Sequence, residues 1–104
     1  MVLSHEMQSR LHQIGNNLQI ARKRRKKSVK QAAEMMGTSV SSVRRIEAGD
    51  PSVRFETYLA ALEVYQLNYT LRFADPEDDH IGQALEKQRL PHRVREKKEK
   101  RLDF

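Results

Sequence analysis

The stretch SVKQAAEMMGTSVSSVRRIEAG, from Ser28 to Gly49, decides the fold of this chain. Its apolar positions predict two short helices that meet at Gly37, because glycine adopts the positive φ of a tight turn at little cost. Ser28 is a good N-cap for the first helix, and Thr38 or Ser39 caps the second. The second helix ends at residues 48–51, AGDP, where glycine follows the last turn and proline comes soon after.

The second of these helices has two unlike faces. Helical spacing turns Val43 and Ile46 inward and leaves four residues outside: Val40, Ser41, Arg44 and Arg45. A helix with small polar groups and two guanidinium groups on its free face suits the major groove of DNA.

We therefore predict a DNA-binding face on this helix. Val40, Ser41 and Arg45 are expected to face bases, and Arg45 can donate two hydrogen bonds to a guanine. Ser39 and Ser42, with the free N–H groups of the helix start, suit phosphate oxygens. Taken alone, Arg44 and Arg45 would be interpreted as a solvated surface pair, but the Gly turn and the paired helices favour DNA.

Composition agrees with a polyanion as partner. The chain has 104 residues, a net charge of +6 and no cysteine, which favours one domain and excludes disulfides and thiolate sites. Charge is uneven along the chain: residues 1–27 carry seven bases and one acid, whereas residues 51–79 carry two bases and six acids. No apolar run approaches the roughly 18 residues of a membrane span, and no signal peptide is visible, so we expect a cytoplasmic protein with no membrane contact.

A run of six cations, Arg22 to Lys27, ends the predicted first helix. Cations are favourable at a helix C-terminus, so the run is either a solvated helix end or a phosphate-binding segment. Within it, Lys23 and Lys27, followed by Ser28, are the candidates for DNA contact. Arg22 and Glu47 each border an apolar stripe and are expected to form a structural ion pair, since an exposed Glu47 would repel phosphate.

Four regions follow from these patterns. Residues 1–10 are expected to be an N-terminal extension, and residues 11–66 the DNA-binding domain. The apolar positions Leu11, Ile14, Leu18 and Ala21 predict a helix from about Leu11 to about Arg25. A further helix starts near Arg54, with a stripe of Phe55, Tyr58, Leu59, Leu62 and Tyr65.

The period then changes from helical to alternating. Leu67, Tyr69, Leu71 and Phe73 alternate with polar residues, which predicts one β-strand. A lone strand needs a partner, and a second copy of the chain is the simplest supplier, so a homodimer is expected. The alternatives are an irregular extension or a further helix on the core. A short helix near residues 79–85 completes a dimerisation or partner region over 67–90, and residues 91–104 are expected to be a basic disordered tail.

No grouping of residues indicates catalysis or a cofactor. The four histidines are scattered without metal-ligand spacing, and Glu77, Asp78 and Asp79 are more typical of a solvated helix start than of a cation site. The chain has no Gly-rich phosphate loop and no Ser/His/Asp set on a common face. We therefore expect a binding protein with no cofactor or metal, and not an enzyme.

Residues 11–66 resemble the helix-turn-helix domain of phage repressors and XRE-type regulators. The resemblance rests on IGNNLQIAR at Ile14–Arg22, AAEMMGTSVSSVRRIEAG at Ala32–Gly49, and the Pro51-Ser52 start of the next helix. It implies a five-helix lambda-repressor-like domain and a sequence-specific repressor of double-stranded DNA. It also implies a pair between the positions of Arg22 and Glu47, and a backbone contact for the position of Arg44.

The following segment narrows the resemblance. LNYTLRF at Leu67–Phe73 is similar to the C-terminal strand of HipB-type antitoxins, which pairs across their dimer. This implies an antitoxin that represses its own operon, with a HipA-type kinase toxin as partner. Two alternatives stay open: an antitoxin that acts mainly by binding the kinase, and an RNA-associated or scaffolding module. Where many members have Thr-Gln, this chain has Ser28-Val29, and Val29 cannot donate the phosphate contact of that glutamine.

Overall fold

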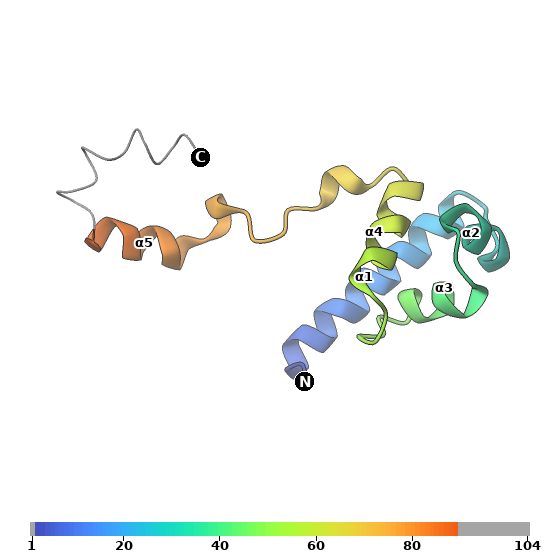
Figure 1. Ribbon diagram of the computed structural model, residues 1–104, viewed down its shortest axis with the longest axis horizontal. Coiled ribbons are helices and arrows are strands. Elements are labelled where there is room, and N and C mark those ends of the chain that lie inside the picture. The colour runs from blue at the N-terminus through green and yellow to red at the C-terminus, as the bar shows by residue number, and fades with distance from the viewer. Residues whose placement is uncertain (1, 90–104) are drawn as a thin grey trace. The chain divides into compact units, whose positions relative to one another are not determined.

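The computed structural model describes residues 2–89, and these fall into two compact units that divide between Leu71 and Arg72. Figure 1 shows the helices α1 to α5 in chain order. The first unit holds four α-helices and one 3₁₀ turn: α1 (His5–Arg24), α2 (Val29–Met36), α3 (Val40–Glu47), α4 (Phe55–Val64) and η1 (Asn68–Thr70). The second holds η2 (Pro76–Asp78) and α5 (His80–Arg89).

The helix α1 begins six residues before the predicted start at Leu11. Ser4 is its N-cap, and the Ser4 Oγ accepts a hydrogen bond of 3.1 Å from the Met7 N–H. An exposed pair between Glu6 and Arg10, at 3.2 Å, supports the first turns. The expected N-terminal extension therefore belongs largely to α1, because the capping serine marks a start that no apolar stripe reveals.

Side-chain caps define α2 and α3 much as predicted. The Ser28 Oγ accepts from the Gln31 N–H at 3.0 Å while the Gln31 side chain accepts from the Ser28 N–H at 2.8 Å, which is a capping box. Gly37 ends α2 with φ of 72°, and Ser39 caps α3 by accepting from the Ser42 N–H at 3.0 Å. Local chemistry thus fixes the turn between the two helices.

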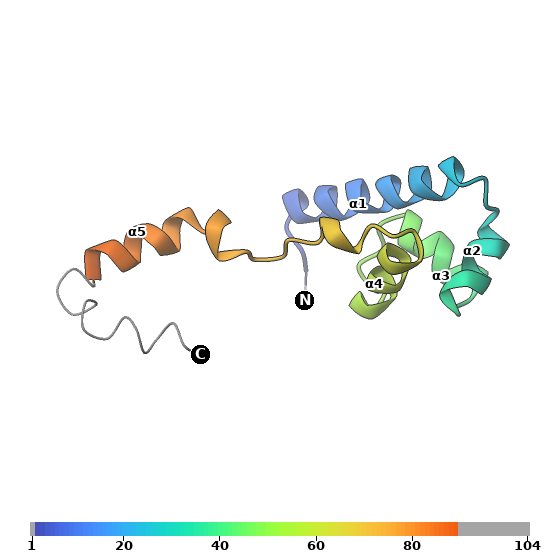
Figure 2. The same cartoon turned by 90° about the horizontal axis from the view of Figure 1, so that it is seen from above.

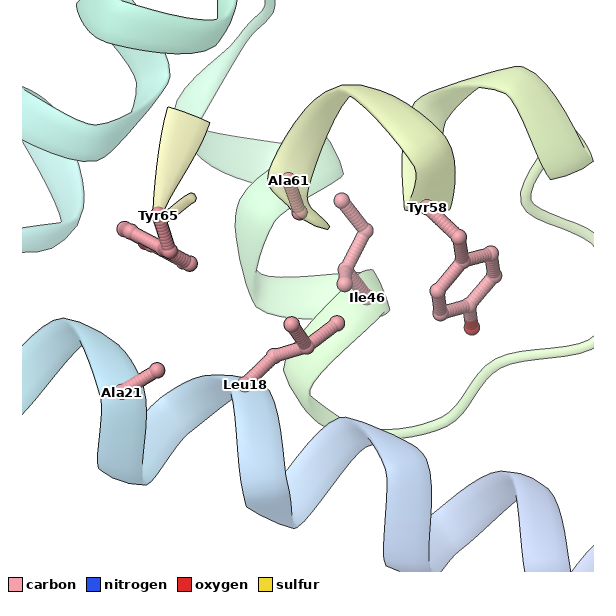
Figure 3. Packing of buried hydrophobic residues seen from close by; sticks show 6 residues of the cluster. All are labelled: Leu18, Ala21, Ile46, Tyr58, Ala61 and Tyr65. Atoms are coloured by element: carbon pink, nitrogen blue, oxygen red, sulfur yellow. The ribbon is translucent and has the colours of Figure 1, made fainter. Parts of the chain in front are cut away.

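The core of the first unit lies where α1 packs beside the shorter helices (Figure 2). Figure 3 shows side chains from α1, α3 and the α4 region converging on one another: Leu18, Ala21, Ile46, Tyr58, Ala61 and Tyr65. A second cluster joins α2 to α3 through Ala32, Ala33 and Val43. Two members of the predicted stripes are exposed instead, Ile14 at 44% and Phe55 at 51%.

The predicted strand at residues 67–73 is wrong, and no strand occurs within residues 2–89. The chain turns back after α4: Gln66 has φ of 58°, and the Leu67 N–H donates to the Leu62 carbonyl at 2.7 Å. Further along, the Thr70 N–H donates to Leu67 and the Leu71 N–H to Asn68. These local bonds satisfy backbone groups that a strand would have left for a neighbouring strand, and residues 2–89 contain no such neighbour.

The second unit contains the short helix expected near residues 79–85. The Asp79 Oδ1 accepts from the Gly82 N–H at 2.8 Å at the start of α5, as the sequence predicted. Its apolar residues Ile81 and Leu85 are 77% and 56% exposed. The expected disordered tail, 91–104, lies outside the described residues.

Candidate nucleic-acid interface

The helix α3 presents a polar, cationic face opposite its buried one. Val43 and Ile46 are 0% and 1% exposed, so they anchor α3 in the core. Ser41, Arg44 and Arg45 are exposed, and the spacing of three and four residues places them on one face of the helix. This is the arrangement that the sequence predicted for these three residues.

Three other predicted contact residues, Val40, Ser39 and Ser42, also make contacts within the protein. Val40 is half-buried and packs against the cluster of Ala32, Ala33 and Val43, so its side chain contributes to the contact between α2 and α3. The Ser39 and Ser42 hydroxyls lie 3.0 Å apart and hydrogen-bond to each other at the helix start. Ser39 also serves as the N-cap, which gives its hydroxyl a structural task in addition to any phosphate contact.

The structure divides the six-cation run into internal and outward-facing members. Lys23, at the end of α1, is exposed, and Lys27 is half-buried just before the exposed Ser28. Arg25 is also exposed, but its guanidinium makes bonds within the protein: it donates to the Ala21 carbonyl at 2.9 Å and the Tyr65 carbonyl at 2.8 Å.

The Arg25 guanidinium also lies 5.4 Å from the centre of the Tyr65 ring. Arg25 therefore ties the end of α1 to the end of α4. The sequence did not indicate this role, because a residue in a run of cations offers no local signal that separates it from its neighbours.

The predicted pair between Arg22 and Glu47 is confirmed. The Arg22 Nε and Nη2 donate to the two carboxylate oxygens of Glu47 at 2.7 and 3.0 Å, and both side chains are less than a tenth exposed. A third bond, from Nη1 to the Lys27 carbonyl at 2.9 Å, holds the turn after α1. The hydrogen bond to Glu47 raises the pKa of Arg22 against the opposing effect of burial, so this guanidinium stays charged.

A cleft of about 310 Å³ lies between α1, α2 and the last turn of α3. Its lining includes both members of the ion pair and one residue of the exposed face of α3, Arg44. The full lining is Gln19, Arg22, Val29, Arg44, Glu47 and Ala48. Gln19 and Ala48 were absent from the predicted site. Gln19 lies on α1, far from α3 in sequence, and only the packing of the helices brings it to the same cleft as Arg44.

The turn after α3 is held by a compact set of bonds around Asp50. Its Oδ1 accepts from the Ser52 N–H and the Ser52 Oγ, both at 2.8 Å, and these bonds lower the pKa of Asp50. The Tyr58 hydroxyl donates to the Asp50 carbonyl at 3.0 Å, which ties this turn to α4. Burial raises the pKa of Tyr58, so its hydroxyl remains a donor.

The described residues show neither a membrane-spanning helix nor a cluster of metal ligands. None of the helices within residues 2–89 is both long and apolar enough to cross a membrane. Over the same residues, no group of three or more His, Asp or Glu side chains could hold a metal ion.

Comparison with known proteins gives one match. A family model described as a helix-turn-helix domain matches residues 13–72, which is more than half of the chain. The matched segment runs from the middle of α1 to just past η1 and includes the whole face of α3. Neither the curated proteins nor the solved structures contain a match.

Proposed function

The chain belongs to the helix-turn-helix domain family, a class of DNA-binding regulators, and we propose that it is a sequence-specific repressor that reads the major groove with α3. The observation that carries this proposal is the division of α3 into two faces. Val43 and Ile46 fix the helix in the core, and Ser41 and Arg45 are left exposed on its other side.

Arg45 is the residue we assign to base recognition. It lies one turn beyond Ser41 on the exposed face, and its planar guanidinium can donate two parallel hydrogen bonds to the O6 and N7 of guanine. Ser41, a short donor and acceptor nearer the helix start, would contact a neighbouring base edge. Val40 would offer the part of its side chain that is left uncovered to a thymine methyl group.

Phosphate contacts would flank this helix on the side of α1. Lys23 and Lys27 would bring charge from the end of α1 and the turn after it, and Arg44 lines the 310 Å³ cleft together with Gln19. The side-chain amide of Gln19 is suited to donate the hydrogen bond to a phosphate that Val29 cannot donate. Such contacts set affinity and register without reading sequence.

Repression follows from occupancy of a promoter, and two copies would give the specificity that one short helix lacks. Two recognition helices in a two-fold operator stand about 34 Å apart. A homodimer is therefore part of this proposal. The segment that resembles the antitoxin strand, Leu67–Phe73, contains the 3₁₀ turn η1 and no strand, so it does not support pairing across a dimer. An antitoxin with a HipA-type kinase toxin as partner stays the alternative proposal.

Selection of binding sites from a random duplex library tests the proposal. We expect one enriched sequence with two-fold symmetry. Unrelated DNA should compete for the protein, and this competition should become weaker as the salt concentration rises. An RNA-associated or scaffolding module would enrich no duplex, and that outcome would reject sequence-specific repression.

Two alanine variants then separate base reading from phosphate contact. Arg45→Ala should relax the preference at one base pair, at a cost of about 1–3 kcal/mol. Lys23→Ala should weaken all duplexes alike and flatten the salt dependence by about 0.9 in the log–log slope. Arg10→Ala is the charge-matched control, because Arg10 lies about 20 Å before Lys23 along α1. An unchanged preference in Arg45→Ala would disprove its assigned role.

A further inference from the structure

The helix α1 meets the end of α3 through backbone at two glycines. A Cβ placed on Gly15 would lie 2.6 Å from the carbonyl oxygens of Ile46 and Glu47, and 2.7 Å from the Gly49 nitrogen. Real Cβ atoms essentially never come this close to another heavy atom. Since the obstructing atoms are backbone, no side chain could rotate aside to make room.

Gly49, just after α3, is packed against the backbone of α1 in the same way. A Cβ on Gly49 would lie 2.7 Å from the Leu11 carbonyl oxygen and 2.7 Å from the His12 Cα. Gly49 also has φ of 69°, which disfavours other residues. We call Gly15 and Gly49, with the backbone they touch, the glycine joint.

The presence of Gly15 is otherwise unexplained. It stands inside the 20-residue helix α1, where glycine is less favourable than alanine because it leaves the unfolded chain more freedom. The close approach of α1 and α3, which lie against each other in Figure 2, accounts for it.

The joint acts on the part of α3 that also carries the ion pair. The space beside Gly15 is filled by the Glu47 carbonyl, and Arg22, seven residues later on the same face of α1, binds the Glu47 carboxylate. The last turn of α3 is therefore held against α1 at two points. The ion pair fixes its position along α1, and the glycine joint fixes how closely the two helices approach.

We propose that Gly15 and Gly49 are positioning residues for DNA recognition. They set the angle and depth of α3 relative to the cations at the end of α1, so that Arg45 reaches a base while Lys23 reaches a phosphate. This inference rests on the proposed function. A side chain at either glycine would push α3 away from α1 and separate base reading from phosphate contact.

The chain supplies a matched pair of glycines for the test. Gly37 and Gly49 have nearly the same φ, 72° and 69°, but a Cβ on Gly37 meets nothing within 4 Å. Gly37→Ala and Gly49→Ala therefore carry the same backbone strain, and only the second carries the steric overlap. Affinity is measured for the selected site and for an unrelated duplex, at a temperature where circular dichroism shows both variants folded.

We expect Gly49→Ala to lower affinity for the selected site by roughly ten- to a hundredfold, comparable to the loss of one base contact. Its affinity for the unrelated duplex should stay within about twofold, because phosphate contacts carry nonspecific binding. Gly37→Ala should keep the wild-type ratio of the two affinities. An unchanged ratio in Gly49→Ala would show that the joint serves stability alone and would overturn the proposal.

Gly15→Ala provides a second, independent variant, with Asn16→Ala on the exposed side of α1 as control. It places no residue at positive φ, so it introduces the steric overlap without the backbone strain of Gly49→Ala. We expect the same loss of the affinity ratio, and wild-type behaviour of Asn16→Ala. If wild-type protein itself shows no preferred duplex, the proposed function fails; if it shows one that Gly15→Ala retains, only the joint fails.

Discussion

Replacing Glu47 by alanine is expected to destabilise the first unit far more than the loss of an exposed glutamate would. The change removes both carboxylate acceptors, at 2.7 and 3.0 Å, from a guanidinium whose side chain is only 9% exposed. Arg22 would keep one internal acceptor, the Lys27 carbonyl. Breaking a buried pair by removing one partner typically costs about 3–5 kcal/mol, because the remaining charge is desolvated without compensation.

This magnitude is large for a domain of this size. A 60–100-residue domain loses about 4–8 °C in Tm for each kcal/mol, so Glu47→Ala should lower Tm by more than about 12 °C. Urea unfolding followed by circular dichroism gives the free energy directly. Arg22→Lys should fall between wild type and Glu47→Ala, since an ammonium group keeps the charge but not the planar, two-point contact.

The exposed pair of Arg54 and Glu56 supplies the control. Its side chains are 78% and 70% exposed, so Glu56→Ala should cost no more than about 1 kcal/mol. Replacing both members of the buried pair, as Arg22→Met with Glu47→Leu, should recover much of the stability lost in the single variant. A Glu47→Ala protein as stable as the Glu56→Ala control would refute the argument from burial.

Other expectations concern single groups around the core. Tyr58→Phe removes a donor to the Asp50 carbonyl and should lower the free energy of unfolding by about 1 kcal/mol. Tyr65→Phe removes a buried hydroxyl that has no partner among the described residues, so the free energy of unfolding in urea should be unchanged or higher. Burial also raises the pKa of Tyr65, so the variant should lose less stability than wild type above pH 10.0. Hydrogen bonds from the N–H and hydroxyl of Ser52 lower the pKa of Asp50 from 3.8, so the stability that the ionised carboxylate contributes is present above pH 3.8 and is lost as the pH falls below it. The Tm of Asp50→Asn should therefore vary less with pH in that acidic range than the Tm of wild type. Ser28→Ala removes the cap of α2 and should cost about 1 kcal/mol in urea unfolding.

The central features of the fold could be predicted from sequence because short-range chemistry specifies them. Ser28 and Ser39 cap helices through residues three positions away, and Gly37 supplies a turn that its neighbours could not adopt. The inward spacing of Val43 and Ile46 determined which face of α3 remained free, and with it the candidate site. The pair of Arg22 and Glu47 was predictable because each residue borders an apolar stripe at the end of its helix.

Other features depended on contacts between distant segments. The alternation of Leu67 to Phe73 is compatible with a strand, but a strand forms only beside another, and the local bonds of η1 satisfy the backbone instead. Ile14 lies outside the core although it fits the stripe of α1, because burial depends on which helices cover each face. The same reason hid Gly15, whose missing side chain makes room for the backbone of α3, a partner more than thirty residues away in sequence. Hydrogen bonds within a turn are encoded locally, whereas close packing is decided only when the helices meet.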